Sequence, residues 1–135
     1  MMKKNIFFIG LIVILAAITG CDSGGGGPTG PVNAPVIQNS RVRPNPAFPG
    51  ATLVFEIDFV DVPGDLNGGT AVITDNQGNN YQGLVSNANG TGGTLVTSIT
   101  LSPLLRSGTS LQFTIFVVDL AGNSSNFDYA EITVS

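Results

Sequence analysis

Few side chains in this sequence could do chemistry. Cys21 is the only cysteine, and the 135 residues contain no histidine and no tryptophan. A single cysteine excludes both an intramolecular disulfide and a thiolate metal cluster within one chain. Without histidine, the chain lacks the usual general base near neutral pH, the commonest transition-metal ligand and the middle member of a Ser-His-Asp triad. These absences predict a protein that is not an enzyme.

Three carboxylates follow predicted strands and could bind a cation. Asp61 and Asp65 fall in a loop predicted at residues 61–69, and Asp119 precedes a loop predicted at residues 120–126. In the β-sandwich that the sequence predicts, both loops lie at the same end. Ca²⁺ prefers carboxylates and loop carbonyls as ligands. A calcium site at these three residues is therefore one hypothesis. The alternative is that they cap turns through side-chain hydrogen bonds, and the lack of a D-x-D-x-D-G run favours that alternative.

Two further groups of side chains have a chemical and a structural interpretation. Glu56 and Asp58 share one face of a predicted strand, as paired glycosidase carboxylates would, but an outward face in water favours solvated surface. Tyr81, Phe127 and Tyr129 could stack on sugars. With two tyrosines and no tryptophan in the chain, strand or core packing is the better interpretation.

The first twenty residues have the three parts of a signal peptide. Lys3 and Lys4 give a basic start, residues 6–17 are apolar, and small residues follow. The apolar stretch is about a dozen residues long, against the ~20 that a membrane-spanning helix needs. Residues 1–20 are therefore predicted to be a signal peptide.

The sequence Ile18-Thr19-Gly20-Cys21 resembles the lipobox of bacterial lipoproteins. The resemblance implies that Cys21 becomes the mature N-terminus and carries acyl chains such as palmitate. Each buried CH₂ of these chains adds about 0.8 kcal/mol of membrane affinity. The alternatives are a secretory signal with a chance cysteine and an N-terminal membrane helix. Asp22 resembles the inner-membrane retention signal of enteric bacteria, which other groups do not follow, so the choice of inner or outer membrane stays open.

The predicted mature chain starts with a tether. Residues 21–34 contain the run SGGGGPTGP, which has no side chain able to build a core. With Lys3 and Lys4 removed, three arginines face nine acidic residues, a net charge of −6. An acidic chain repels phosphate backbones and anionic headgroups, so nucleic acid is excluded as a partner and membrane contact is expected through the lipid alone.

Residues 35–135 are predicted to form one all-β domain. Short apolar runs alternate with turns rich in Pro, Gly, Asn and Asp, which is typical of a β-sandwich. Leu53, Phe55, Ile57 and Phe59 should form one buried face, and residues 111–117 should lie in a central strand. Seven antiparallel strands are predicted, at residues 36–42, 52–60, 70–74, 80–86, 94–101, 110–119 and 127–134.

This part of the chain resembles the immunoglobulin and fibronectin type III group of bacterial surface modules. The resemblance rests on Pro49-Gly50 before the second strand, on the D-x-A-G-N turn at residues 119–123, and on seven strands in about 100 residues. It differs from that group in lacking the buried tryptophan, the tyrosine near the sixth strand and the inter-sheet disulfide. The core must then be held by packing of Phe, Ile, Leu and Val.

These features predict a lipoprotein held on the non-cytoplasmic side of a bacterial envelope membrane, with an Ig-like binding or spacer module that contacts envelope proteins or glycans. The alternatives are a structural subunit of a surface assembly, paired through edge strands, and a carbohydrate-binding accessory module. In the sandwich, the acidic loops lie at the end where the chain enters. The turn between the first two strands and the turns at residues 76–79 and 103–109 should face away and are the better place for a partner. Arg106 lies in the last of these turns.

Overall fold

The computed structural model describes residues 33–135. The predicted signal peptide, Cys21 and most of the predicted tether lie outside the described residues. Within residues 33–135, no helix is long and apolar enough to cross a membrane.

The described residues form seven β-strands, in the order predicted from the alternation of apolar and polar residues. They are β1 (Val36–Arg43), β2 (Thr52–Val60), β3 (Thr70–Asp75), β4 (Asn80–Leu84), β5 (Gly92–Thr100), β6 (Ser110–Val118) and β7 (Asp128–Thr133).

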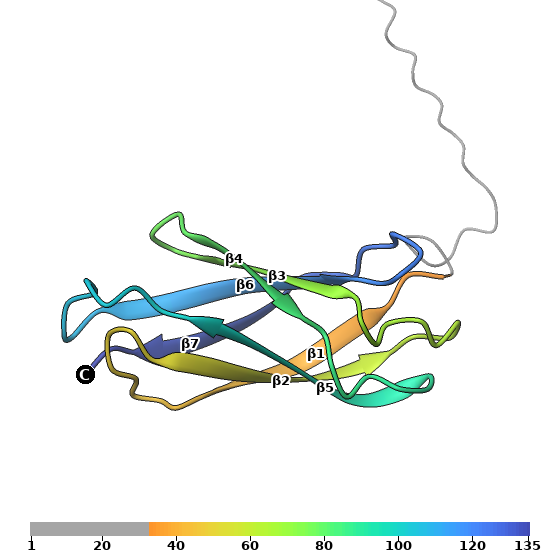
Figure 1. Cartoon of the computed structure of the whole chain (residues 1–135), viewed down its shortest axis with the longest axis horizontal. Coiled ribbons are helices and arrows are strands. Elements are labelled where there is room, and N and C mark those ends of the chain that lie inside the picture. Colours follow the sequence, from red (N-terminus) through yellow and green to blue (C-terminus); the bar gives the residue numbers. More distant parts are fainter. Residues whose placement is uncertain (1–32) are drawn as a thin grey trace, which may run out of the picture. The chain divides into compact units, whose positions relative to one another are not determined.

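The strands form two sheets that stack face to face (Figure 1). One sheet has the order β1-β2-β5 and the other the order β4-β3-β6-β7, and every neighbouring pair within them is antiparallel. The fourth strand joins the sheet of the third, sixth and seventh strands. The predicted fold class, a seven-stranded antiparallel Ig-like or fibronectin type III-like β-sandwich, is confirmed.

Strict alternation along the strands builds the core between the sheets. In β2 the four apolar residues at every second position are buried, and the residues between them, Val54, Glu56 and Asp58, are half-buried on the outer face. The same holds for Leu111, Phe113, Ile115 and Val117 of β6, which lies between β3 and β7 as predicted for a central strand. Phe55 and Phe113 meet edge to face across the sheets, with 5.3 Å between ring centroids.

Side chains at the start of β7 and in the loop before it hold β1, the edge strand of the first sheet. The side-chain amide of Asn126 accepts a hydrogen bond from the Ile37 backbone N–H and donates one to the Ile37 carbonyl, both 2.9 Å. Asn39 has a positive φ of 55° where the pairing of β1 with β2 shifts. This irregularity turns Ser40 toward Asp128, whose Oδ2 accepts from the Ser40 amide (2.9 Å) and hydroxyl (2.6 Å).

The segment after β1 continues along β7 and covers its outer edge. Asn45 Oδ1 accepts a hydrogen bond from the Thr133 amide (3.1 Å). Ala47 then pairs with the end of β7 by donating to the Thr133 carbonyl (2.9 Å) and accepting from the Ser135 amide (2.8 Å). The chain thus passes from one sheet to the other, so β7 is bonded on both of its edges.

Candidate functional site

The three aspartates predicted as a calcium site lie together at one end of the sandwich. One carboxylate oxygen from each of Asp61, Asp65 and Asp119 lies within 4.8 Å of the other two. The loops at residues 61–69 and 120–126 meet at the end where β1 begins, on the right in Figure 1. The sequence therefore predicted both the convergence of these residues and the end of the fold that carries them.

Asp61 is the first residue after β2 and is completely buried. Its amide donates to the Thr91 carbonyl (2.9 Å), and its own carbonyl accepts from the Gly64 amide (2.9 Å). Its Oδ2 atom accepts from the Asp65 amide (2.9 Å), which is the turn-capping bond of the alternative interpretation. Its Oδ1 atom is buried and has no hydrogen-bond partner among the described residues.

Asp65 joins the two loops through its backbone. Its carbonyl accepts a hydrogen bond from the Leu120 amide (3.1 Å). Its side chain resembles that of Asp61 in one respect, because its Oδ1 atom is also buried without a partner in residues 33–135. Turn capping therefore accounts for one carboxylate oxygen of Asp61 and leaves these two Oδ1 atoms unexplained.

Asp119 organises the turn after β6. Its Oδ1 atom accepts from the amides of Ala121 (3.0 Å) and Asn123 (2.8 Å), and its Oδ2 atom accepts from the Asn123 side chain (3.2 Å). Gly122 has a φ of 90°, which suits glycine. The D-x-A-G-N sequence thus forms a turn built around its aspartate.

The β3–β4 turn repeats this arrangement at another place in the fold. Asp75 and Asn79 fit the pattern D-x-x-G-N, and Asp75 Oδ1 accepts from the amides of Gln77 and Asn79, both at 2.9 Å. Its Oδ2 atom accepts from the Asn79 side chain (3.0 Å) and from the Tyr81 hydroxyl (3.1 Å). Only the later turn was identified from the sequence, although the spacing of Asp, Gly and Asn is the same in both.

The two environments shift carboxyl pKa values in opposite directions. Burial raises the pKa of Asp61, against the hydrogen bond from the Asp65 backbone. The charges of Asp65 and Asp119 and the contact with the Asp65 carboxyl group raise this pKa as well. For Asp75, burial alone would raise the pKa, but hydrogen bonds from Asn79, Gln77 and Tyr81 outweigh it and hold the pKa below its usual value. In the acidic cluster of Asp61, Asp65 and Asp119, unlike at Asp75, a buried carboxylate therefore has too few hydrogen-bond donors to keep its pKa low.

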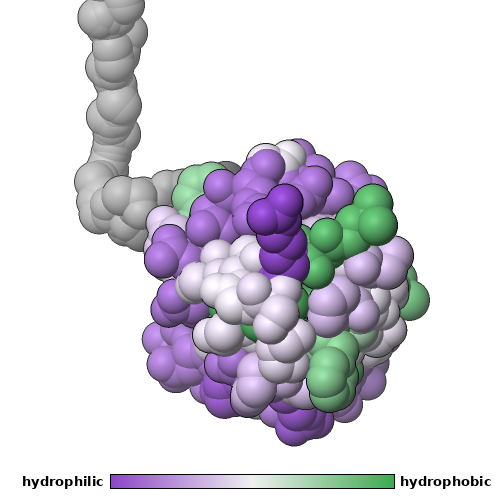
Figure 2. Space-filling view, turned by 90° about the vertical axis from the view of Figure 1, so that its left-hand side faces the viewer, coloured by the Kyte–Doolittle hydropathy of each residue, from purple (hydrophilic) through white to green (hydrophobic). Residues whose placement is uncertain are grey.

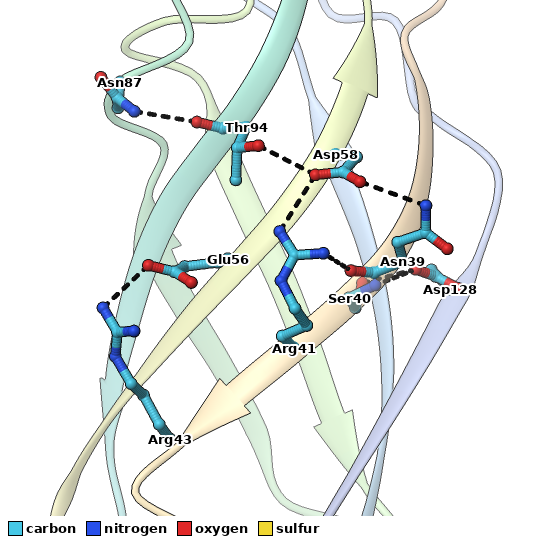
Figure 3. Close-up of polar contacts among 9 residues, drawn as sticks. All are labelled: Asn39, Ser40, Arg41, Arg43, Glu56, Asp58, Asn87, Thr94 and Asp128. Carbon is cyan, nitrogen blue, oxygen red and sulfur yellow. Dashed lines mark hydrogen bonds and ion pairs between the residues drawn. The ribbon is translucent and has the colours of Figure 1, made fainter.

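The strand carboxylates that could suggest glycosidase chemistry are paired with arginines on an outer sheet face (Figure 3). Arg41 lies 3.1 Å from Asp58, and Arg43 lies 2.8 Å from Glu56. Hydrogen bonds from Arg41, then from Thr94 and Asn39, lower the pKa of Asp58. A general acid needs a raised pKa. Asp58 and Glu56 therefore behave as partners in surface ion pairs and not as a catalytic pair.

The three aromatic residues considered for sugar stacking do not form one platform. Tyr81 pairs with core-facing Ile73, and its hydroxyl is bonded to Asp75. Tyr129 pairs with Thr114 on the outer face of the sheet, while Phe127 packs edge to face against Phe116. An open hollow of about 540 Å³ beside Tyr129 is lined by polar residues such as Gln112 and Glu131 and by the apolar residues Phe113 and Ala130.

The end of the sandwich opposite the acidic cluster carries exposed apolar side chains. Phe48, after β1, is 71% exposed and Leu104, between β5 and β6, is 88% exposed. Their loops touch, because the Gly50 amide donates to the Ser102 carbonyl (3.1 Å). Figure 2 views this end and shows hydrophobic surface gathered on one side of it, beside hydrophilic residues. Arg106 lies in the same loop as Leu104 and is exposed.

Comparisons with known proteins add little to this description. No protein-family model matches the chain, and no curated protein matches it. Among solved structures, the chain is similar to the PKD domain of an M14-like peptidase from Thermoplasmatales archaeon SCGC AB-540-F20. The two share 18% sequence identity with a TM-score of 0.48, over 76% of this chain and 97% of that one. A similarity this low identifies no function.

Proposed function

We propose that this chain is a lipid-anchored, non-enzymatic binding or spacer module on the non-cytoplasmic side of a bacterial envelope membrane. The observation that carries the proposal is the Ile18-Thr19-Gly20-Cys21 sequence, placed directly after a basic and apolar segment of signal-peptide length. A Gly-rich tether and a β-sandwich follow it. Such a chain has an attachment point, a spacer and a folded unit in that order.

A binding role without catalysis agrees with the side chains of the sandwich. The sequence contains no histidine, and within residues 33–135 the carboxylates on the outer face of β2 are paired with arginines. The buried carboxylates of the acidic cluster are held in loops beside each other, with an oxygen-only set of side chains. These groups can bind a cation or a partner, and without histidine the chain lacks the base of a Ser-His-Asp triad.

The exposed end with Phe48 and Leu104 is the surface that we assign to a protein partner. Phe48, Leu104 and Arg106 lie at the end of the sandwich opposite the one where β1 begins. Apolar side chains beside an arginine on touching loops are typical of small interaction surfaces.

A structural subunit that polymerises through its edge strands is disfavoured by the way the edges are covered. β7 is bonded along its outer edge by Asn45 and Ala47, and the outer edge of β1 is bonded at Ile37 by the Asn126 side chain. On the opposite side of the sandwich, Ser86 and Val96 exchange two backbone hydrogen bonds of 2.9 Å that link the two sheets. Covered edges offer few free backbone groups for pairing between copies.

Replacing the proposed lipid acceptor tests the anchor. The change is Cys21→Ser, which keeps the size of the side chain but removes the thiol. We expect the wild-type protein in the membrane fraction, labelled by radioactive palmitate, and the variant unlabelled and released from the membrane. Membrane fractionation and fatty-acid labelling in a bacterial host measure both results.

The matched control is Ser23→Ala, two residues farther along, which should be labelled and fractionate as the wild type does. A Cys21→Ser protein that remains in the membrane fraction to the same extent would overturn the anchor. Protease treatment of intact cells then reports which side of the envelope the domain occupies.

A further inference from the structure

Two carboxylate oxygens of the acidic cluster are buried without a hydrogen-bond donor or a positive charge beside them among residues 33–135. We propose that Asp61, Asp65 and Asp119 form a calcium-binding site that joins the β2–β3 loop to the loop after β6. Asp61 is completely buried and its Oδ1 atom has no hydrogen-bond partner, and Asp65 Oδ1 is buried in the same condition. A buried carboxylate oxygen without a donor costs free energy, and a cation removes that cost.

No positive side chain of the described residues neutralises the cluster. Within residues 33–135, the two ion pairs join Arg41 to Asp58 and Arg43 to Glu56 on the outer face of the first sheet. Arg106 lies in the β5–β6 loop, at the other end of the sandwich. A bound divalent ion would supply the charge that the chain itself does not bring to this end.

The β3–β4 turn serves as an internal reference for the cluster. Asp75 sits in the same D-x-x-G-N turn as Asp119, and there a fourth donor, the Tyr81 hydroxyl, completes the hydrogen bonds to the carboxylate. At the second turn the neighbouring side chains are those of Asp61 and Asp65, which are acceptors when ionised. The D-x-x-G-N turn therefore forms at Asp75 with no acidic cluster beside it in the described part of the chain, so the turn itself does not account for Asp61 and Asp65 beside Asp119.

The spacing and chemistry of the three residues suit calcium. Two ligands of one calcium ion lie at most about 5 Å apart, because each Ca–O distance is about 2.3–2.6 Å. The cluster meets this limit, with oxygens within 4.8 Å of one another. Calcium also accepts irregular sets of six to eight oxygens, including backbone carbonyls, whereas magnesium usually retains several waters, for which a buried site such as Asp61 is poorly suited.

The loops hold the carboxylates in place before any ion binds. The β2–β3 loop is bonded to neighbouring segments through the Asp61 amide to Thr91, the Gly68 amide to Val85, and the Asp65 carbonyl to Leu120. Leu66 between them is completely buried. A site built on loops fixed in this way loses little conformational freedom when it binds an ion.

Thermal unfolding of the full chain in detergent tests the site, with calcium chloride as the probe. Against EDTA, about 10 mM calcium should raise Tm by about 5–10 °C, if the dissociation constant is near 1 mM as in extracellular modules. Titration calorimetry should give one ion per chain. Magnesium at the same concentration should produce a clearly smaller shift.

Variants of the cluster should fold and lose this response. Asp61→Asn keeps an oxygen that can accept from the Asp65 amide and removes one of three clustered charges, so in EDTA its Tm should be no lower than that of the wild type. Its calcium shift should fall below about 1 °C, as should that of Asp65→Asn. The matched control is Asp75→Asn, which weakens the equivalent turn and lowers Tm but should keep the full calcium shift.

A wild-type Tm that calcium leaves unchanged, together with no heat of binding, would overturn the site. A calcium shift that persists in both Asp61→Asn and Asp65→Asn would also overturn it, as would an equal response to magnesium. The inference does not depend on lipid anchoring, because unfolding is measured on the purified chain wherever the cell places it.

Discussion

Asp75 and Asp119 occupy equivalent positions in two turns of the same sequence pattern, yet their surroundings differ. The Asp75 carboxylate accepts a hydrogen bond from the Tyr81 hydroxyl, whereas Asp119 has Asp61 and Asp65 beside it. Turn chemistry is local, so the pattern D-x-x-G-N specifies the bonds within each turn. What surrounds the turn depends on the segments that pack against it.

The sequence predicted the convergence of Asp61, Asp65 and Asp119 because strand order alone brings their loops to one end. It could not predict that two Oδ1 atoms would be buried without donors. That outcome depends on the path of the β2–β3 backbone. This path directs the Asp65 amide to Asp61 Oδ2 and leaves Asp61 Oδ1 without a donor among the described residues. Side-chain hydrogen bonds of this kind are set by tertiary packing rather than by residue type.

Tyr81→Phe should make the domain less stable at neutral pH and change its response to alkali. Burial, together with the charge of Asp75 and the hydrogen bond to it, raises the pKa of Tyr81 to about 12. An unfolded tyrosine has a pKa of about 10, so the stabilisation by Tyr81 is complete below pH ~10 and is lost as the pH rises toward ~12. The variant should lack this alkaline loss and unfold about 1 kcal/mol more easily at pH 7.

Urea unfolding at pH 7 and at a series of alkaline pH values measures both effects. Tyr129→Phe, at a residue that is 64% exposed on the outer face of β7, controls for removal of a tyrosine hydroxyl. Equal stability of Tyr81→Phe and the wild type at neutral pH would contradict the role given to the Asp75 bond.

At the scale of the strands, the sequence predicted the elements well and their ends less well. β4 was expected to continue to residue 86 but ends at Leu84, because Ser86 leaves β3 and bonds to Val96 in the other sheet. β5 was expected to begin at Thr94 but begins at Gly92. Glycines carry no side chain from which alternation can be read, although Gly92 and Gly93 pair fully with β2.

The link between β4 and β5 brings their backbones unusually close at Gly83. A Cβ atom on Gly83 would lie 2.2 Å from Thr97 Oγ1 and 2.8 Å from the Ser98 carbonyl oxygen. Gly83→Ala should therefore lower the free energy of unfolding by about 2–3 kcal/mol, because the two strands must separate. Chemical denaturation followed by circular dichroism measures the change.

Gly92→Ala is the matched control, since it also lies in a strand but its Cβ would meet nothing nearer than the Phe59 carbonyl oxygen at 3.5 Å. It should be neutral or slightly stabilising, because alanine reduces the freedom of the unfolded chain. Equal losses in the two variants would mean that strand propensity, rather than close approach at Gly83, sets the cost.

At the scale of the whole domain, the two ends have different character. One end carries buried carboxylates where the chain enters, and the other carries exposed Phe48, Leu104 and Arg106. The sequence predicted this division from strand direction, since consecutive antiparallel strands fix the end at which each loop falls. It did not single out Phe48 or Leu104, because apolar residues in loops show no periodicity.

Site-specific photo-crosslinking in cells distinguishes the two ends as partner surfaces. A photoreactive residue at position 104 should form adducts with an envelope protein. The matched position is Leu120, an exposed leucine at the opposite end, 66% exposed against 88% for Leu104, and it should form few or none. Adducts from position 120 alone, or in equal yield from both, would contradict the assignment of the partner surface.

The contacts of β1 also determine how the domain would respond to a pulling force. β1 is paired with β2 along most of its length and is held on its other side by Asn126 and Asp128. A load between residue 33 and a partner bound at the opposite end would run along the axis of β1. The hydrogen bonds of β1 would then be loaded together in shear and not broken one after another. The side chains that cover a sheet edge would then also set the mechanical strength of the module.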